Sequence, residues 1–73
     1  MIYAYSESYL NDAKENLAAY LTKVGGVESA IYNYNDALNI RTSILNEVNT
    51  YTAAVSVAET YEKICAPYYR QNN

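Results

Sequence analysis

Residues 27–65 read VESAIYNYNDALNIRTSILNEVNTYTAAVSVAETYEKIC and contain neither glycine nor proline. The lack of both turn-forming residues over this length predicts helical structure. One stripe of mostly apolar positions runs through it at alternating steps of three and four: Val27, Ala30, Tyr34, Ala37, Arg41, Ile44, Val48, Tyr51, Val55, Ala58, Glu62 and Cys65. A seven-residue repeat that stays in phase is typical of helices packed side by side. The stretch therefore predicts an all-α protein.

Two arrangements of this stretch fit the sequence. In the first, residues 27–65 form one helix of about 58 Å at 1.5 Å per residue, and the shorter helix before it covers only its first part. The result is an antiparallel helical hairpin whose long second helix needs a second copy of the chain to cover it. This arrangement predicts a homodimer, with the self-association residues Ile44, Val48, Tyr51, Val55 and Ala58.

In the second arrangement, the helix breaks at residues 49–52, where Asn-Thr-Tyr-Thr places four poor helix formers together. Thr50 or Thr52 then caps a third helix. Three helices of similar length close a compact three-helix bundle. The unbroken stripe favours the first arrangement and the local helix propensity favours the second, so the sequence leaves both open.

The chain before residue 27 predicts a further helix. The apolar side chains that share one face of it are Leu10, Ala13, Leu17, Tyr20 and Val24, at steps of three and four. Ser6 or Ser8 is a suitable N-cap, and Gly25-Gly26 ends the helix because glycine adopts the left-handed C-cap conformation without strain.

We therefore predict a single helical domain over residues 1–73, with helices at about 6–24, 27–48 and 51–66. Pro67 is expected to stop the last helix, because the residue before a proline disfavours the helical conformation. The residues after it are expected to form a short tail.

Length and charge limit the kinds of protein that this chain can be. It has 73 residues and one cysteine, so its core is small and a partner or second copy is the expected source of added stability. The net charge of −3 leaves no basic patch to neutralise phosphates, and we expect no direct binding of nucleic acid.

The same composition predicts a cytoplasmic protein. The longest apolar run, residues 17–21, is far shorter than the ~20 residues that span a bilayer, so we expect no membrane role. The N-terminal residues lack the basic and apolar regions of a secretion signal. A single cysteine suits a reducing compartment.

Catalysis is hard to build from these residues, and we predict that the protein is not an enzyme and holds no cofactor or metal. The chain has no histidine, which is the usual general base near neutral pH. Cys65 lies on the apolar stripe, where a buried thiol acts as a small hydrophobic group. The carboxylate pairs Asp12/Glu15 and Glu59/Glu62 are expected on solvated helix faces.

Tyrosine is the unusual feature of the composition, with ten tyrosines and neither phenylalanine nor tryptophan. Tyrosine is favoured in protein–protein interfaces, because its ring buries apolar area and its hydroxyl finds a partner. The residues predicted to contact a partner protein are Tyr32, Tyr34, Asn35, Asn39 and Tyr51.

Arg41 is a charge on the apolar stripe and has two interpretations. Its side chain can snorkel at the edge of the apolar face. Alternatively, it pairs with Glu47 or Glu62 across a helix–helix seam and fixes the register of the helices.

Residues 5–17 carry the pattern Tyr-x-Glu-x-Tyr-Leu-x-Asp-Ala-x-x-Asn-Leu. This opening resembles short uncharacterised proteins carried by mobile elements and phages of Gram-positive bacteria, and it covers about a fifth of the chain. The resemblance implies a genomic setting in which small acidic proteins inhibit host defence, anti-CRISPR proteins among them, by analogy. We therefore expect a protein that binds and blocks a partner; the alternative is a structural subunit of a helical assembly, of the virion or secretion-needle type.

Overall fold

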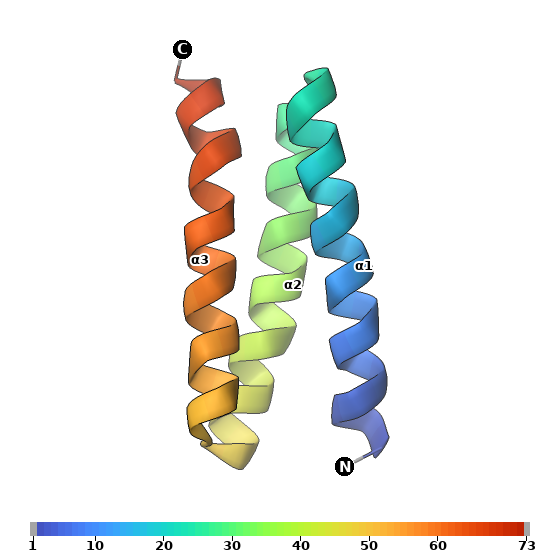
Figure 1. Cartoon of the computed structure of the whole chain (residues 1–73), viewed down its shortest axis with the longest axis vertical. Helices are drawn as coiled ribbons and strands as arrows, with labels where there is room; N and C mark the ends of the chain where they lie inside the picture. The colour runs from blue at the N-terminus through green and yellow to red at the C-terminus, as the bar shows by residue number, and fades with distance from the viewer. Residues whose placement is uncertain (1, 73) are drawn as a thin grey trace.

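The computed structural model describes residues 2–72, and the side chains of residues 10–72. Three helices follow one another: α1 (Ile2–Val24), α2 (Val27–Val48) and α3 (Tyr51–Gln71). They form an all-α three-helix bundle in which α1 and α3 run in one direction and α2 returns between them (Figure 1). Both outer helices pack along α2, and they touch each other far less. The compact bundle is therefore the correct one of the two predicted arrangements, and the single long helix is wrong.

The turn between α1 and α2 is made by the predicted glycine pair. Gly25 has a φ of +92°, a conformation that strains any residue with a Cβ atom. The amide of Gly26 donates a hydrogen bond of 2.7 Å to the carbonyl of Leu21, which satisfies one of the carbonyl groups left open at the end of α1.

The turn between α2 and α3 lies where the helix propensity is lowest. Asn49 adopts the left-handed conformation, with a φ of 46°, and its amide donates to the carbonyl of Leu45. Thr50 then caps α3, because its Oγ1 accepts a 3.2 Å hydrogen bond from the amide of Ala53. Asparagine is the non-glycine residue best suited to the left-handed conformation. Two consecutive residues, Asn49 and Thr50, therefore end α2 and begin α3.

Two predicted helix ends are wrong. The backbone is helical from Ile2, so neither Ser6 nor Ser8 is the start of α1. At the other end, α3 continues through Pro67 to Gln71, and the expected tail is mostly helix. Proline removes one helical hydrogen bond, but its ring is fully buried in the bundle, and burial of the ring offsets part of that loss.

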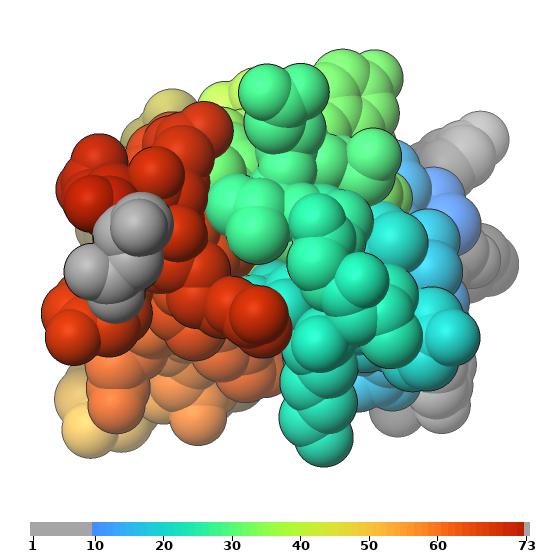
Figure 2. Space-filling view, turned by 90° about the horizontal axis from the view of Figure 1, so that it is seen from above, coloured from blue at the N-terminus to red at the C-terminus, as the bar shows by residue number. Residues whose placement is uncertain are grey.

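The apolar core is small and lies towards the end of the bundle where α1 and α3 finish. It joins Ala18 of α1, Ala30 and Tyr34 of α2, and Ile64 of α3, with Leu21 packed against them. At this same end the Arg70 guanidinium donates to the carbonyl of Thr22. Figure 2 views the molecule from this end and shows the last turns of α3 lying beside the turn that joins α1 and α2.

The seven-residue stripe faces the core in α2 only. Ala30, Tyr34 and Ala37 are buried there, as the stripe predicts. In α3 the buried residues are Thr60, Ile64 and Pro67, and the positions that continue the stripe, Ala58, Glu62 and Cys65, are exposed. The prediction of a buried Cys65 is therefore wrong, because the break at Asn49 turns α3 about its axis relative to the continuous helix.

Candidate functional site

A polar cluster joins the three helices below the apolar core. Glu15 of α1 has a side chain only 3% exposed, and both of its oxygens are bonded. Oε2 accepts 2.7 Å and 2.9 Å hydrogen bonds from Arg41 Nε of α2 and Thr60 Oγ1 of α3. Oε1 accepts a 2.8 Å hydrogen bond from Lys63 Nζ. A carboxylate bonded to both other helices in this way fixes the relative height of the helices.

Arg41 uses the rest of its guanidinium on two further groups. Its Nη1 donates to Ser56 Oγ at 2.6 Å, and its Nη2 donates to Asp12 Oδ1 at 2.8 Å. The prediction that Arg41 pairs with Glu47 or Glu62 is wrong, although an ion pair does cross the seam between helices. The expectation that Asp12 and Glu15 share a solvated face is right for the exposed Asp12 and wrong for the buried Glu15.

The hydrogen bonds of the cluster hold its charges in place. Burial on its own raises the pKa of Glu15, but the hydrogen bonds from Lys63, Arg41 and Thr60 outweigh it and leave that pKa below its ordinary value. The hydrogen bond to Glu15 raises the pKa of Lys63. Burial raises the pKa of Tyr34, the ring of which lies above this cluster.

Asn11 lies on the inner face of α1, outside the polar cluster. It is fully buried, and neither atom of its amide has a hydrogen-bond partner among the described side chains. A buried amide without partners costs stability. Sequence reasoning did not single out Asn11, and no pattern in the sequence marks it.

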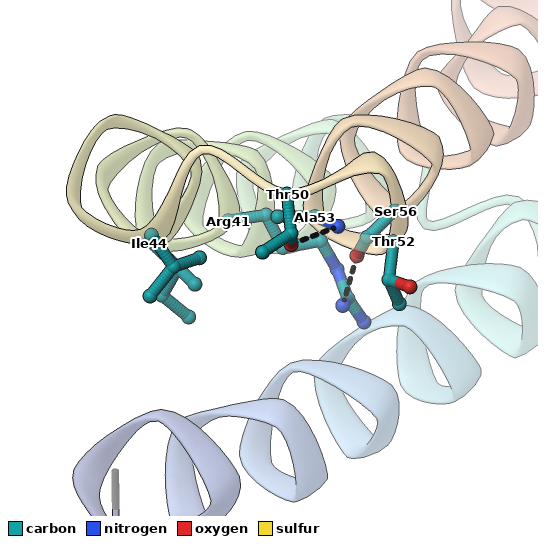
Figure 3. Close-up of a pocket in the computed structure, with 7 residues that line it drawn as sticks. Arg41, Ile44, Thr50, Thr52, Ala53 and Ser56 are labelled. Atoms are coloured by element: carbon teal, nitrogen blue, oxygen red, sulfur yellow. Dashed lines mark hydrogen bonds between the residues drawn. The ribbon is translucent and has the colours of Figure 1, made fainter.

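An open groove lies at the end of the bundle where α2 turns into α3. It encloses about 210 Å³ and is lined by Arg41, Ile44, Val48, Thr50, Thr52, Ala53 and Ser56. Figure 3 shows Arg41 pointing from α2 into the space between the helices, with α1 running past the open side. The side chains of residues 2–9 lie outside the described part of the structure, so we assign this groove no occupant.

Each of the two outer helices has a line of exposed, mostly apolar side chains. The α1 outer face consists of Leu10, Ala13, Leu17, Tyr20 and Val24, all of them exposed. The α3 outer face consists of Tyr51, Ala54, Ala58, Tyr61, Cys65 and Tyr68, which are also all exposed. Both follow alternating steps of three and four, the spacing that a second helix needs in order to pack along the first. These faces, and not an enclosed pocket, are the candidate functional sites.

The residues predicted to contact a partner do not form one surface. Tyr32, Asn35 and Asn39 share a side of α2, and Tyr32 is 72% exposed. Tyr34 is 4% exposed, so its prediction as a contact residue is wrong: it belongs to the core. From Tyr32 to the end of α2 at Val48 the helix runs for 16 residues, or about 24 Å at 1.5 Å per residue. Tyr51 begins α3 beyond that end.

The residues predicted for self-association are also divided. Ile44 and Val48 are half-buried and line the groove, and Val55 is half-buried on α3. Only Tyr51 and Ala58 are exposed. The bundle has no long overhanging helix, which was the reason for predicting that these five residues form a dimer surface.

The sequence alone shows the apolar line of α1 but does not show whether that line faces the bundle or the solvent. The line at steps of three and four is present in the sequence, yet the side of α1 that enters the bundle carries Asn11, Glu15, Ala18 and Thr22. The usual rule that the apolar line of a helix faces the core fails in α1 because the buried partners of α1 include a charged arginine.

Comparison of the chain with models of protein families, with curated proteins and with solved structures finds no match. Among the described residues, no three acidic or cysteine side chains come together as a possible metal site. Within the same part of the chain, no helix has the length and apolar content needed to cross a bilayer.

Proposed function

We propose that this chain is a cytoplasmic protein-binding protein that acts by covering a surface of a partner protein with its α3 outer face. The observation that carries the proposal is the exposure of Tyr51, Tyr61 and Tyr68 along one side of α3, at 85%, 57% and 42%. Smaller side chains, Ala54, Ala58 and Cys65, separate these rings along the helix.

A line of tyrosines suits recognition of a protein for two physical reasons. Each ring brings a large apolar area with few rotatable bonds, so little side-chain entropy is lost on binding. Each hydroxyl can also form a hydrogen bond at the edge of the interface, which is why tyrosine is frequent among the residues that dominate binding energy.

The charges beside the α3 outer face indicate the kind of partner. Glu59 and Glu62 are exposed next to it, and the whole chain carries a net charge of −3. The complementary surface is an apolar groove with basic side chains at its rim. A nucleic acid does not fit, because it would meet like charge.

Inhibition of a host defence system follows from the resemblance of residues 5–17 to proteins of mobile elements, and it extends the binding proposal. A small helical protein without a catalytic site can inhibit only in proportion to its amount, by occupying a surface that its target needs. The proposal therefore predicts inhibition that saturates at a fixed ratio of this protein to its target.

The test compares three immobilised forms of the chain in a lysate of a Gram-positive bacterium. Protein captured by the wild type should be lost with Tyr61→Ala/Tyr68→Ala and kept with Tyr32→Ala, a matched control whose ring is 72% exposed on α2. Circular dichroism should show all three forms equally helical. Capture that does not change in the double variant, measured with the purified captured protein, would contradict the proposal.

A structural subunit is the second candidate, and one observation favours it. The two outer faces lie on different helices, so contact of an α1 outer face with an α3 outer face of the next copy would be heterologous and could continue as a fibre. Light scattering separates the two candidates: growth into long polymers with concentration favours the subunit, and a closed species favours the binding protein.

A further inference from the structure

The α1 outer face is an apolar line that the bundle leaves in water. Leu10, Leu17, Tyr20 and Val24 are 51%, 49%, 61% and 59% exposed, and Ala13 is exposed between them. The opposite side of α1 is already committed to the polar cluster, so rotation of α1 to bury this line would break the bonds of Glu15. The face can be covered only by something outside the bundle.

We infer that a second copy of this chain covers the α1 outer face, with the two α1 helices packed antiparallel about a two-fold axis. The five residues have the 3.5-residue average spacing that keeps a seam facing a like helix over several turns. A two-fold contact is self-complementary by construction, because each residue meets the same counterpart on both copies.

The sizes of the side chains fit this arrangement. In the register that sets Leu17 opposite Tyr20 of the second copy, Ala13 lies opposite Val24 of the second copy. The two-fold axis repeats both pairs, so the seam has four layers made by Ala13, Leu17, Tyr20 and Val24, and Leu10 lies just beyond its ends. Its smallest residue, Ala13, never faces another alanine, which leaves no gap between the helices.

The charges beside the seam select the antiparallel direction. Asp12 and Lys23 are exposed near opposite ends of the seam and on the same side of it. The antiparallel register brings Asp12 to within about 3 Å, along the axis, of Lys23 of the second copy, at both ends of the seam. In a parallel pair the flanks that carry Asp12 and Lys23 would lie on opposite sides of the seam, so no aspartate would meet a lysine.

The Asp12 carboxylate can make this contact because its side chain remains 62% exposed while it accepts the bond from Arg41. Pairing through α1 also leaves the α3 outer face free on both copies. The dimer therefore presents two copies of the tyrosine surface, and its existence does not depend on what that surface binds.

Sedimentation of the wild type over a range of concentrations tests the pairing. A seam of four layers is small among protein interfaces, so we expect a monomer–dimer equilibrium with a dissociation constant on the order of micromolar. Leu17→Glu and, independently, Ala13→Glu should remain monomeric, while Tyr32→Glu introduces the same charge on α2 and should still dimerise. Helicity by circular dichroism confirms that each variant is folded.

The inference would be overturned by a wild type that stays monomeric at millimolar concentration, by a dimer that survives both glutamate substitutions, or by growth beyond the dimer. The use of two variants keeps the test valid if one of them does not fold. A loss of dimer in Tyr32→Glu as well would place the contact on another face and would also count against α1.

Cross-linking then tests the direction, in a Cys65→Ser background that removes the native thiol. A short bismaleimide should join Leu17→Cys copies, which lie near the two-fold axis. It should not join Val24→Cys copies, which an antiparallel register holds about 16 Å apart along the axis. Efficient linking of Val24→Cys would show a parallel pair and contradict the two-fold seam.

The same variants separate this inference from the proposed function. Leu17→Glu should abolish the dimer and keep capture of the partner by the α3 outer face. Tyr61→Ala/Tyr68→Ala should keep the dimer and lose capture. Failure of one prediction therefore leaves the other standing.

Discussion

The middle helix and the two outer helices use their apolar residues in opposite ways. α2 buries Ala30, Tyr34 and Ala37 and turns Tyr32 and Asn39 outward, as an amphipathic helix in a small bundle should. α1 buries Asn11, Glu15 and Thr22 and leaves leucines in water. The difference shows that the apolar line of a helix does not by itself identify the side that enters the bundle.

The largest expected effect comes from removing the charge that makes the inner face of α1 polar. Arg41→Met leaves Glu15 buried without the cationic partner whose own side chain is only 10% exposed, which should lower the free energy of unfolding by about 3–5 kcal/mol. A loss of that size is comparable to the whole stability of a domain this small. Urea denaturation followed by circular dichroism measures it.

Two controls make this measurement specific. Lys63→Met removes a partner that is 54% exposed, so its loss should be clearly smaller. The double substitution Glu15→Leu/Arg41→Met removes both buried charges and should recover most of the stability. Equal, small losses for Arg41→Met and Lys63→Met would show that the cluster does not fix the inner face of α1.

The second effect compares one tyrosine from the middle helix with one from an outer helix. Tyr34→Ala empties a core position and should cost about 3 kcal/mol. Tyr51→Ala removes a ring that is 85% exposed and should change stability by no more than about 0.5 kcal/mol. Thermal melts of both variants would contradict the described packing if the two values were alike.

A third effect of intermediate size is the response to acid. The pKa of Glu15 is lower in the folded chain than its ordinary value. The ionised carboxylate therefore contributes fully to the free energy of unfolding when the pH is above the ordinary pKa, and this contribution is lost as the pH falls through the pKa of the folded chain. The urea concentration at the midpoint of unfolding should therefore decrease as the pH is lowered below about 4.5. In Glu15→Gln, which cannot ionise, the urea midpoint should decrease less steeply with falling pH. An equally steep decrease would show that another group causes the acid sensitivity.

The smallest effect concerns the turn that separates the middle helix from α3. Thr50→Ala removes the side-chain cap of α3 and should cost about 1 kcal/mol. Thr52→Ala, two residues further on and without a capping bond among the described contacts, should be nearly neutral. The reverse order in urea denaturation would move the start of α3 to Thr52.

The sequence predicted where the turns can lie better than it predicted the orientation of the helices, although it left open whether the helix breaks at residues 49–52. Both turns lie where residue chemistry demands them, at Gly25-Gly26 and at Asn49-Thr50, because left-handed backbone and capping hydroxyls are local properties. The core side of α2 was also readable from its spacing. The prediction that α3 ends before Pro67 was wrong, because the net cost of one missing hydrogen bond depends on how well the proline ring packs. That packing depends on the other helices and is not a local property.

The candidate faces could be recognised only once the bundle was known. Periodicity grouped Leu10, Leu17 and Tyr20 correctly but could not say that Glu15, Arg41 and Thr60 would meet inside and turn that group outward. Tyr34 and Tyr61 are the same residue type on equally periodic helices, and one lies in the core while the other lies in water. The choice depends on contacts between residues 45 positions apart, such as Thr60 with Glu15.

The protonation of the central cluster makes the bundle insensitive to mild acidification. Its carboxylate titrates in stronger acid than usual and its lysine in stronger alkali, and the chain has no imidazole to titrate between them. Transfer between compartments of near-neutral and weakly acidic pH should leave the helix register unchanged.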